Sequence, residues 1–113
     1  MSGISTHILD TSRGRPAAGV QVTLEQQDGE GWHEVNTQVT DPDGRVKQLL
    51  PQHEPLKNGR YRLTFHTQAY FDARGVAGLY PVVQITITVT DFTGHYHIPL
   101  LLTANGYSTY RGS

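Results

Sequence analysis

The sequence predicts an all-β protein, an antiparallel β-sandwich of seven to eight strands with one short helix. Three observations lead to this prediction. Segments in which apolar and polar residues alternate recur along the chain, turn signals separate them about every 8–12 residues, and only one segment has a helical pattern. The 113 residues are enough for a single core, so we expect one domain over residues 1–113.

The segments that we predict to be strands share a period of two in hydrophobicity, which is typical of half-buried strands. Val82–Thr90 has the most regular pattern, because four β-branched apolar residues alternate with Gln and Thr. In Tyr61–His66 the aromatic and leucine positions are expected in the core, and the positions between them on the solvent face. In chain order the predicted strands are Ser5–Leu9, Val20–Glu25, Trp32–Thr40, Val46–Leu50, Tyr61–His66, Val82–Thr90 and His95–Leu101.

Turns and one helix account for most of the remaining chain. We predict a polar turn over Gln26–Gly31 and a tight turn over Asp41–Gly44, where Pro presets φ and Gly accepts a left-handed conformation. Pro51–Gly59, with two prolines, is expected to be a surface loop. Gln68–Val76 is the only convincing helical segment, about two turns long, and Tyr80-Pro81 then requires an extended exit.

Composition excludes several classes of protein. The chain has no cysteine, which rules out disulfides and thiolate nucleophiles and fits a cytoplasmic location. Lys plus Arg (9) nearly balances Asp plus Glu (10), and the positive charges are scattered, so we expect neither nucleic acid nor a membrane surface as a partner. We find no signal peptide pattern and no run of the ~20 apolar residues that would span a bilayer.

The reactive side chains gather toward the C-terminus. A strand over His95–Leu101 would place His95, His97 and Pro99 on one face. We expect the chain to turn at Asn105-Gly106, a dipeptide that accepts positive φ, and to return as a tail that ends in the Ser113 carboxylate. This composition predicts a tail folded back into a site rather than a frayed terminus.

Three interpretations of the histidines remain open at this stage. His95 and His97 on one strand, with His7 on another, resemble a three-histidine zinc site in spacing. Exposed or structural histidines are the commoner case, and metal-free acid–base chemistry is the third possibility. His33, His53 and His66 lie in a turn, a loop and the solvent face of a strand, where we expect no catalytic role.

Four segments, however, together resemble the transthyretin-related 5-hydroxyisourate hydrolases, and the likeness covers essentially the whole chain. The most specific segment is the terminal Tyr-Arg-Gly-Ser, which transthyretin, a hormone carrier of the same fold, does not have. We find no departure at the motif positions. The four segments are Thr6–Asp10, Thr40–Arg45, His95–Leu102 and Tyr107–Ser113.

The resemblance implies a transthyretin-like fold and a reaction in which water opens the lactam ring of 5-hydroxyisourate during urate degradation. The expected product is 2-oxo-4-hydroxy-4-carboxy-5-ureidoimidazoline. The resemblance also implies a homotetramer, a dimer of dimers, and no cofactor or metal.

Carried over residue by residue, the resemblance gives His7, Arg45, His97 and Ser113 catalytic roles, and it places His7, Arg45 and Tyr110 in contact with the substrate. The residue chemistry agrees with this assignment. An imidazole, with an unperturbed pKa of about 6.5, can activate water at neutral pH, and a guanidinium can stabilise an oxyanion. The sequence does not decide which histidine is the base.

Two other classes of function are kept as alternatives. A small-ligand carrier of the transthyretin kind would bind without turnover, and it would not need Arg45 beside two histidines. A zinc-binding β-sandwich would hold a stoichiometric metal ion.

Overall fold

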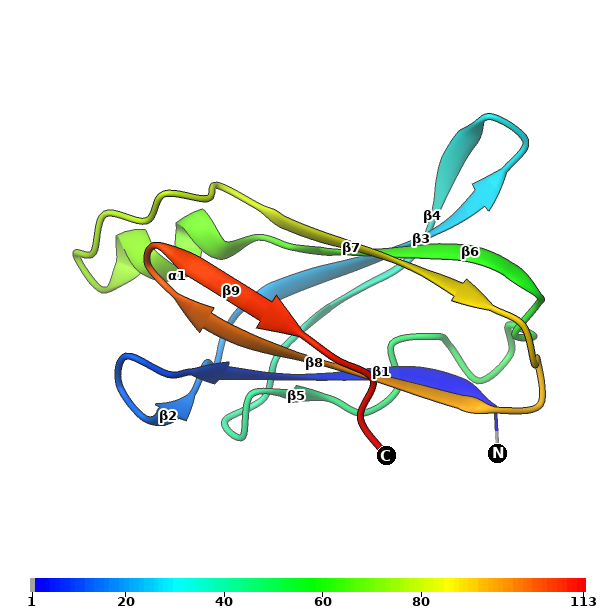
Figure 1. Ribbon diagram of the computed structural model, residues 1–113, viewed down its shortest axis with the longest axis horizontal. Coiled ribbons are helices and arrows are strands. Elements are labelled where there is room, and N and C mark those ends of the chain that lie inside the picture. The colour runs from blue at the N-terminus through cyan, green and yellow to red at the C-terminus, as the bar shows by residue number, and fades with distance from the viewer. Residues whose placement is uncertain (1) are drawn as a thin grey trace.

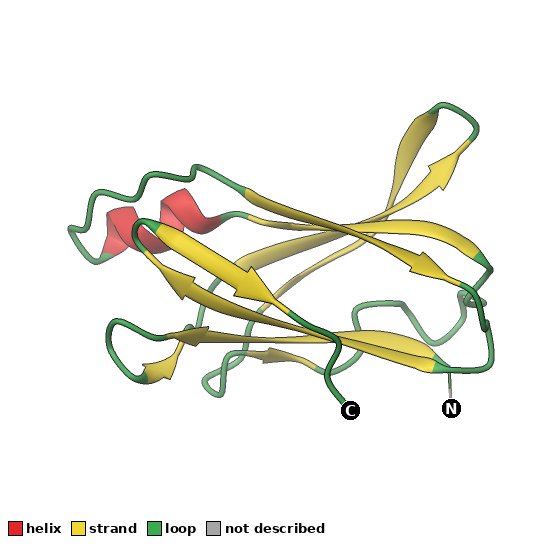
Figure 2. Ribbon diagram, viewed as in Figure 1, coloured by secondary structure: helices red, strands yellow, loops and turns green. Residues whose placement is uncertain are grey.

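The computed structural model describes residues 2–113 and shows two β-sheets packed face to face, with one short helix at one end (Figures 1 and 2). One sheet has the strand order β2-β1-β8-β9, with β5 also paired to β1, and the other has the order β4-β3-β6-β7. The elements are β1 (Gly3–Asp10), β2 (Arg15–Pro16), β3 (Gln21–Asp28), β4 (Gly31–Val39), β5 (Arg45–Val46), β6 (Gly59–Phe65), α1 (Thr67–Ala73), β7 (Val83–Val89), β8 (His95–Thr103) and β9 (Gly106–Thr109).

The predicted β-sandwich with one short helix is confirmed, and the structure adds two features. The described residues form nine strands, because β2 and β5 contain only two residues each and have no sequence pattern of their own. In addition, β1 and β8 are parallel, with Gly3 opposite His95 and Asp10 opposite Leu102. The alternation of apolar and polar residues predicts a strand but not the direction of its neighbour. A parallel pair needs a long connection between its strands, and here that connection includes all strands of the second sheet.

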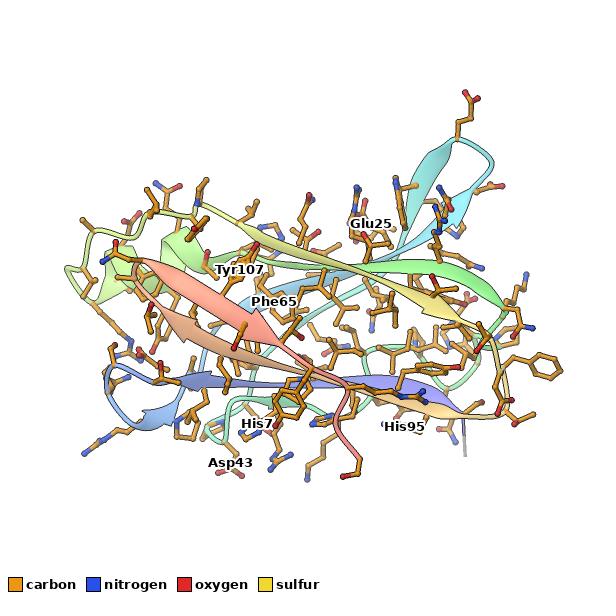
Figure 3. All side chains as sticks on the ribbon, viewed as in Figure 1. His7, Glu25, Asp43, Phe65, His95 and Tyr107 are labelled. Atoms are coloured by element: carbon orange, nitrogen blue, oxygen red, sulfur yellow. The ribbon has the colours of Figure 1, made fainter. Side chains whose placement is uncertain are left out.

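The core lies between the inner faces of the two sheets. As predicted, Tyr61, Leu63 and Phe65 on β6 are buried, and Phe65 is seen between the sheets in Figure 3. Ile4 and Ile8 on β1 of the other sheet are buried in the same core. The even-numbered positions of β1 therefore face the core, and the odd-numbered ones face away from the other sheet.

The predicted strand Val46–Leu50 is mostly wrong, because only Arg45 and Val46 pair with β1. Leu49 and Leu50 are buried in an irregular segment, and the Leu49 amide donates to the Ile4 carbonyl at 2.9 Å. Consecutive apolar residues here fill the core without forming a ladder.

Two predicted turns are also shifted. The strand β3 continues to Asp28, since Gln26 and Gln27 pair with β4 in a hairpin that projects from the sandwich (Figure 1). The β8–β9 hairpin turns at Ala104 and Asn105 rather than at Asn105-Gly106, and none of the described non-glycine residues has a positive φ. The tail nevertheless returns antiparallel to β8, as predicted.

The helix is fastened to the first sheet through a buried carboxylate. Asp10, which is 1% exposed, accepts a hydrogen bond from the Tyr70 hydroxyl of α1 at 2.8 Å. Burial alone would raise the pKa of Asp10, but hydrogen bonds from Ser12, Tyr70 and Arg13 outweigh it and hold the pKa below its usual 3.8. The carboxylate therefore stays ionised at neutral pH and anchors the helix. No helix among residues 2–113 is long and apolar enough to cross a membrane.

We expect Tyr70→Phe to lower the free energy of unfolding by about 1–3 kcal/mol, because a buried charged acceptor loses a donor. The loss should be largest at neutral pH and shrink as the pH falls through the lowered pKa of Asp10, where the folded-state advantage of the carboxylate disappears. Urea unfolding at several pH values measures both effects. Tyr107→Phe, at an exposed tyrosine, is the control, and equal stability losses in the two variants would contradict the anchor.

Candidate active site

The outward face of the first sheet carries the predicted catalytic side chains. The parallel register places Ser5 beside His97 and His7 beside Pro99, while β5 places Arg45 beside His7. Neighbours in register share a face, so the two histidines and the arginine lie on one surface. Figure 3 shows His7 and His95 on the side of this sheet that faces away from Phe65, toward the C-terminus of the chain.

The predicted turn over Asp41–Gly44 fixes the position of Arg45. The Asp41 carboxylate accepts hydrogen bonds from the amides of Asp43 and Arg45, both at 2.9 Å. Gly44 has a φ of 75°, and its carbonyl accepts from the Ile8 amide at 2.8 Å. A Cβ on Gly44 would lie 2.5 Å from the Ile8 carbonyl oxygen, so the turn needs glycine to dock against β1.

A hollow of about 270 Å³ opens on this face. Two cationic side chains, two histidines and no acidic side chain line it, so its electrostatic character favours an anionic or electron-rich ligand. The lining residues are Ser5, Thr6, Arg45, Lys47, His95, His97 and Ser113. His7 borders this group through its pairing with Arg45 but does not line the hollow itself.

A serine joins the two histidines of β8. The Ser5 hydroxyl lies 2.8 Å from His95 Nε2 and 2.7 Å from His97 Nδ1. Ser5 is 6% exposed and His97 is half-buried, whereas His95 is exposed. The arrangement connects a half-buried imidazole in the hollow to an imidazole at the surface.

The tail returns to the site as the sequence predicted. Beyond β9, the Gly112 amide donates to the His97 carbonyl at 2.8 Å, and Ser113 reaches the rim of the hollow. Arg111 lies over the Tyr96 ring, with its guanidinium carbon 4.2 Å from the ring centroid. These contacts hold the end of the tail against β8.

Tyr110 lies apart from the other predicted site residues. It is 57% exposed and lines a different hollow, between the edge of β7 and the β8–β9 hairpin. The residues around it there include Ile85, Ile98 and Arg111. Within one chain, the structure therefore brings together Arg45, His97 and Ser113, with His7 beside them, but not Tyr110.

The site keeps His97 uncharged near neutral pH. Burial lowers the pKa of the His97 imidazole below its usual 6.5, and the nearby charges of Arg45, His7 and His95 lower it further. A neutral imidazole can accept a proton, so His97 has the protonation state of a general base.

Sequence reasoning missed Ser5, Thr6 and Lys47 as lining residues. The parallel pairing that places Ser5 beside His97 joins strands 92 residues apart, and no local pattern reveals it. Lys47 follows Arg45 by two residues, and this i, i+2 spacing was the available signal. Among residues 2–113 no group of three or more His, Asp or Glu side chains is arranged to hold a metal ion.

The chain is similar to known proteins over almost its whole length. The model of the HIUase/Transthyretin family matches residues 4–112. The chain belongs to this family. It is 47% identical over 114 residues to the 5-hydroxyisourate hydrolase of Deinococcus radiodurans, covering 98% of this chain and 96% of that one. It is 44% identical over 110 residues to the 5-hydroxyisourate hydrolase of Salmonella typhimurium, covering 97% of this chain and 80% of that one.

Solved structures of the family include both a hydrolase and a carrier. The 5-hydroxyisourate hydrolase of Klebsiella pneumoniae aligns with a TM-score of 0.87 at 41% identity over 100% of both chains. Sea bream transthyretin in complex with thyroxine aligns with a TM-score of 0.89 at 29% identity, covering 96% of this chain and 93% of that one. The backbone thus fits both branches of the family, while the sequence identity is higher to these hydrolases, at 41–47%, than to sea bream transthyretin, at 29%.

The contact between the tail and the His97 ring can be tested at Gly112. A Cβ there would lie 2.5 Å from His97 Cδ2 and 3.2 Å from Pro99 Cγ. We therefore expect Gly112→Ala to displace the His97 imidazole and weaken the hydrogen bond of residue 112, so that its amide exchanges about 2- to 10-fold faster. Imidazole NMR shifts and hydrogen exchange measure this.

Gly106→Ala is the matched control, because its Cβ would meet only Thr103 Oγ1, at 3.7 Å. Neither glycine has a positive φ, so backbone strain does not distinguish the two variants. Unchanged His97 resonances in Gly112→Ala would show that the tail does not rest on the ring.

Proposed function

We propose that this protein is a 5-hydroxyisourate hydrolase, an enzyme that opens the lactam ring of its substrate to give 2-oxo-4-hydroxy-4-carboxy-5-ureidoimidazoline in urate degradation. The observation that carries the proposal is the hollow where Arg45, His97 and Ser113 meet. The hydrolases of Deinococcus and Salmonella, at 47% and 44% identity, support the substrate. One domain, residues 1–113, carries the activity.

In the proposed mechanism, His97 activates the attacking water. Its Nδ1 atom lies within hydrogen-bond distance of the Ser5 hydroxyl. Among the described residues, every fully buried side-chain nitrogen or oxygen has a hydrogen-bond partner. Nε2 of His97 has none, so this atom must be accessible to solvent, where it can take a proton from water. His7, bordering Arg45, assists in positioning the water or the substrate.

Arg45 stabilises the negative charge that develops when hydroxide adds to the lactam carbonyl. The carbon–nitrogen bond then breaks, and the leaving nitrogen takes the proton that the base removed from water. A preorganised guanidinium contributes because the turn over Asp41–Gly44 fixes the backbone of Arg45 before the reaction. Lys47 adds a second positive charge to the hollow, and Ser113 orients a histidine or the water.

The substrate contact predicted for Tyr110 stays a prediction, since this residue lies in the other hollow. The proposed chemistry needs no cofactor or metal. A cytoplasmic location remains an expectation based on the cysteine-free sequence.

A transthyretin-like carrier is the alternative with a specific observation behind it, the likeness to the thyroxine complex of sea bream transthyretin. A carrier would bind ligand without consuming it. A zinc-binding β-sandwich is the other alternative, and it would lose its function with its metal.

The deciding experiment follows the ultraviolet loss of freshly generated 5-hydroxyisourate, corrected for spontaneous decay. We expect Arg45→Ala to keep the fold and to lower the rate about 10²- to 10³-fold, because an oxyanion donor is removed. Arg60→Ala, at an exposed arginine of the opposite sheet, is the matched control. Near-normal turnover by a folded Arg45→Ala variant would overturn the mechanism.

The same assay separates the alternatives. We expect full activity after dialysis against a chelator. Recovery that depends on added zinc would instead favour the metal site, and binding without any turnover would favour the carrier.

We also propose a homotetramer, a dimer of dimers, with sites between dimers. The support is the exposed edges of the two sheets at β7 and β9, which lie on the same side of the sandwich (Figure 1). Tyr107 of β9 and Tyr80, which pack edge to face, are both exposed. Light scattering at micromolar concentration should give four times the mass of the 12.5 kDa chain. A fully active monomer would contradict this assembly.

A further inference from the structure

The hydroxyl of Ser5 lies between two imidazole nitrogens but carries only one proton. It is 2.8 Å from His95 Nε2 and 2.7 Å from His97 Nδ1. If both histidines donated to its oxygen, the hydroxyl proton of this 6% exposed serine would have no acceptor among its described contacts, so one histidine should donate and the other accept. The tautomers of the two histidines are therefore coupled through Ser5. No role for Ser5 follows from the mechanism above.

Two neutral arrangements use the Ser5 proton in one of these hydrogen bonds. In the first, His97 donates from Nδ1 to the Ser5 oxygen, Ser5 donates to His95 Nε2, and His97 presents an unprotonated Nε2 to the hollow. In the second, His95 donates from Nε2, Ser5 donates to His97 Nδ1, and His97 presents a protonated Nε2. The first arrangement offers a base to the substrate, and the second offers an acid.

We propose that Ser5 is a positioning residue that relays a proton between His97 and His95, so that one imidazole serves first as base and then as acid. The inference rests on the proposed function and deepens it. Opening a lactam requires both roles, a base to deprotonate water and an acid to protonate the leaving nitrogen. The relay supplies both at one atom, His97 Nε2.

The proton balance closes in both directions. When His97 Nε2 takes a proton from water, its Nδ1 proton moves to the Ser5 oxygen, and the Ser5 proton moves to His95 Nε2. His97 is then neutral and protonated at Nε2, Ser5 is again a hydroxyl, and His95 carries the charge. As His97 Nε2 gives its proton to the leaving nitrogen, the two transfers reverse and the starting arrangement returns.

Burial and nearby charge differ between the two histidines of the relay. His97 is half-buried, and Arg45 and Lys47 in the same hollow, with His7 bordering it, oppose a lasting positive charge on its ring. Ser113 also lines the hollow. His95 lines the same hollow but is exposed, so water can stabilise a charge on its ring. Passing the proton outward through Ser5 therefore moves the charge from an unfavourable site to a solvated one.

Imidazole NMR of histidine-labelled protein tests the coupling without any substrate. In the wild type we expect His97 and His95 each to be held in a preferred tautomer, and in Ser5→Ala to become tautomer mixtures. Ser5→Thr, which keeps the hydroxyl, should restore the wild-type spectrum. Unchanged tautomers in Ser5→Ala would overturn the proposal. Because this arm needs no turnover, it remains decisive even if 5-hydroxyisourate is not the substrate.

Kinetics test the relay itself. We expect Ser5→Ala to lower kcat about 10- to 100-fold, which is part of the ~10²–10⁴-fold that a positioned acid–base group contributes. KM should change less than about twofold, and the pH–rate profile should shift. Ser5→Thr should recover the rate. Ser108→Ala, an exposed serine on β9, is the matched control and should behave as the wild type.

His95→Gln keeps the proposal falsifiable if Ser5→Ala fails to fold. Glutamine retains hydrogen-bonding capacity at this exposed position but cannot carry a proton, so we expect a similar fall in kcat in a folded protein. Wild-type kcat and pH profile in His95→Gln would overturn the relay. A Ser5→Ala variant that loses stability but keeps its kcat would reduce Ser5 to a packing role.

Discussion

The parallel pairing of β1 with β8 is the constraint on which the site depends. It aligns Gly3 to Asp10 with His95 to Leu102, and it puts Ser5 beside His97. Because side chains alternate between the faces of a strand, a slip of one residue would turn the outward histidines toward the core and the core residues toward solvent. The buried Ile4 and Ile8 oppose such a slip. The hydrophobic core therefore sets the register of the polar face.

Rigid elements hold most of the reactive groups in this surface. His97 lies inside a strand with neighbours on both sides, and Arg45 follows a turn whose geometry depends on Gly44. The end of the tail is held at the hollow by the bridge between His97 and Gly112 and by Arg111 over the Tyr96 ring. The hollow combines positive charge, which can stabilise an oxyanion, with an imidazole that burial keeps neutral, and this suits the attack of water on a carbonyl carbon.

The same scaffold serves different purposes within the HIUase/Transthyretin family. The similar TM-scores to a hydrolase and to a thyroxine-bound transthyretin, 0.87 and 0.89, show that the backbone does not distinguish them. Function must then lie in side chains added to a common sandwich. In this chain the side chains that we propose for catalysis lie on the outward face of one sheet and at the returning tail, while the inner faces supply the core.

The sequence by itself determined the strands with strict alternation, such as β6 and β7, the turn before Arg45 and the helix near Tyr70, because these follow from local hydrophobic period and turn chemistry. It did not determine the irregular course of Leu49 and Leu50, where burial rather than a ladder fixes the chain. Only the tertiary structure decided that β1 and β8 are parallel, that Ser5 bridges two histidines and that Tyr110 faces another hollow. The first two facts depend on pairing between segments some ninety positions apart, and the third depends on the path of the tail past a strand edge. No local sequence pattern encodes these long-range contacts.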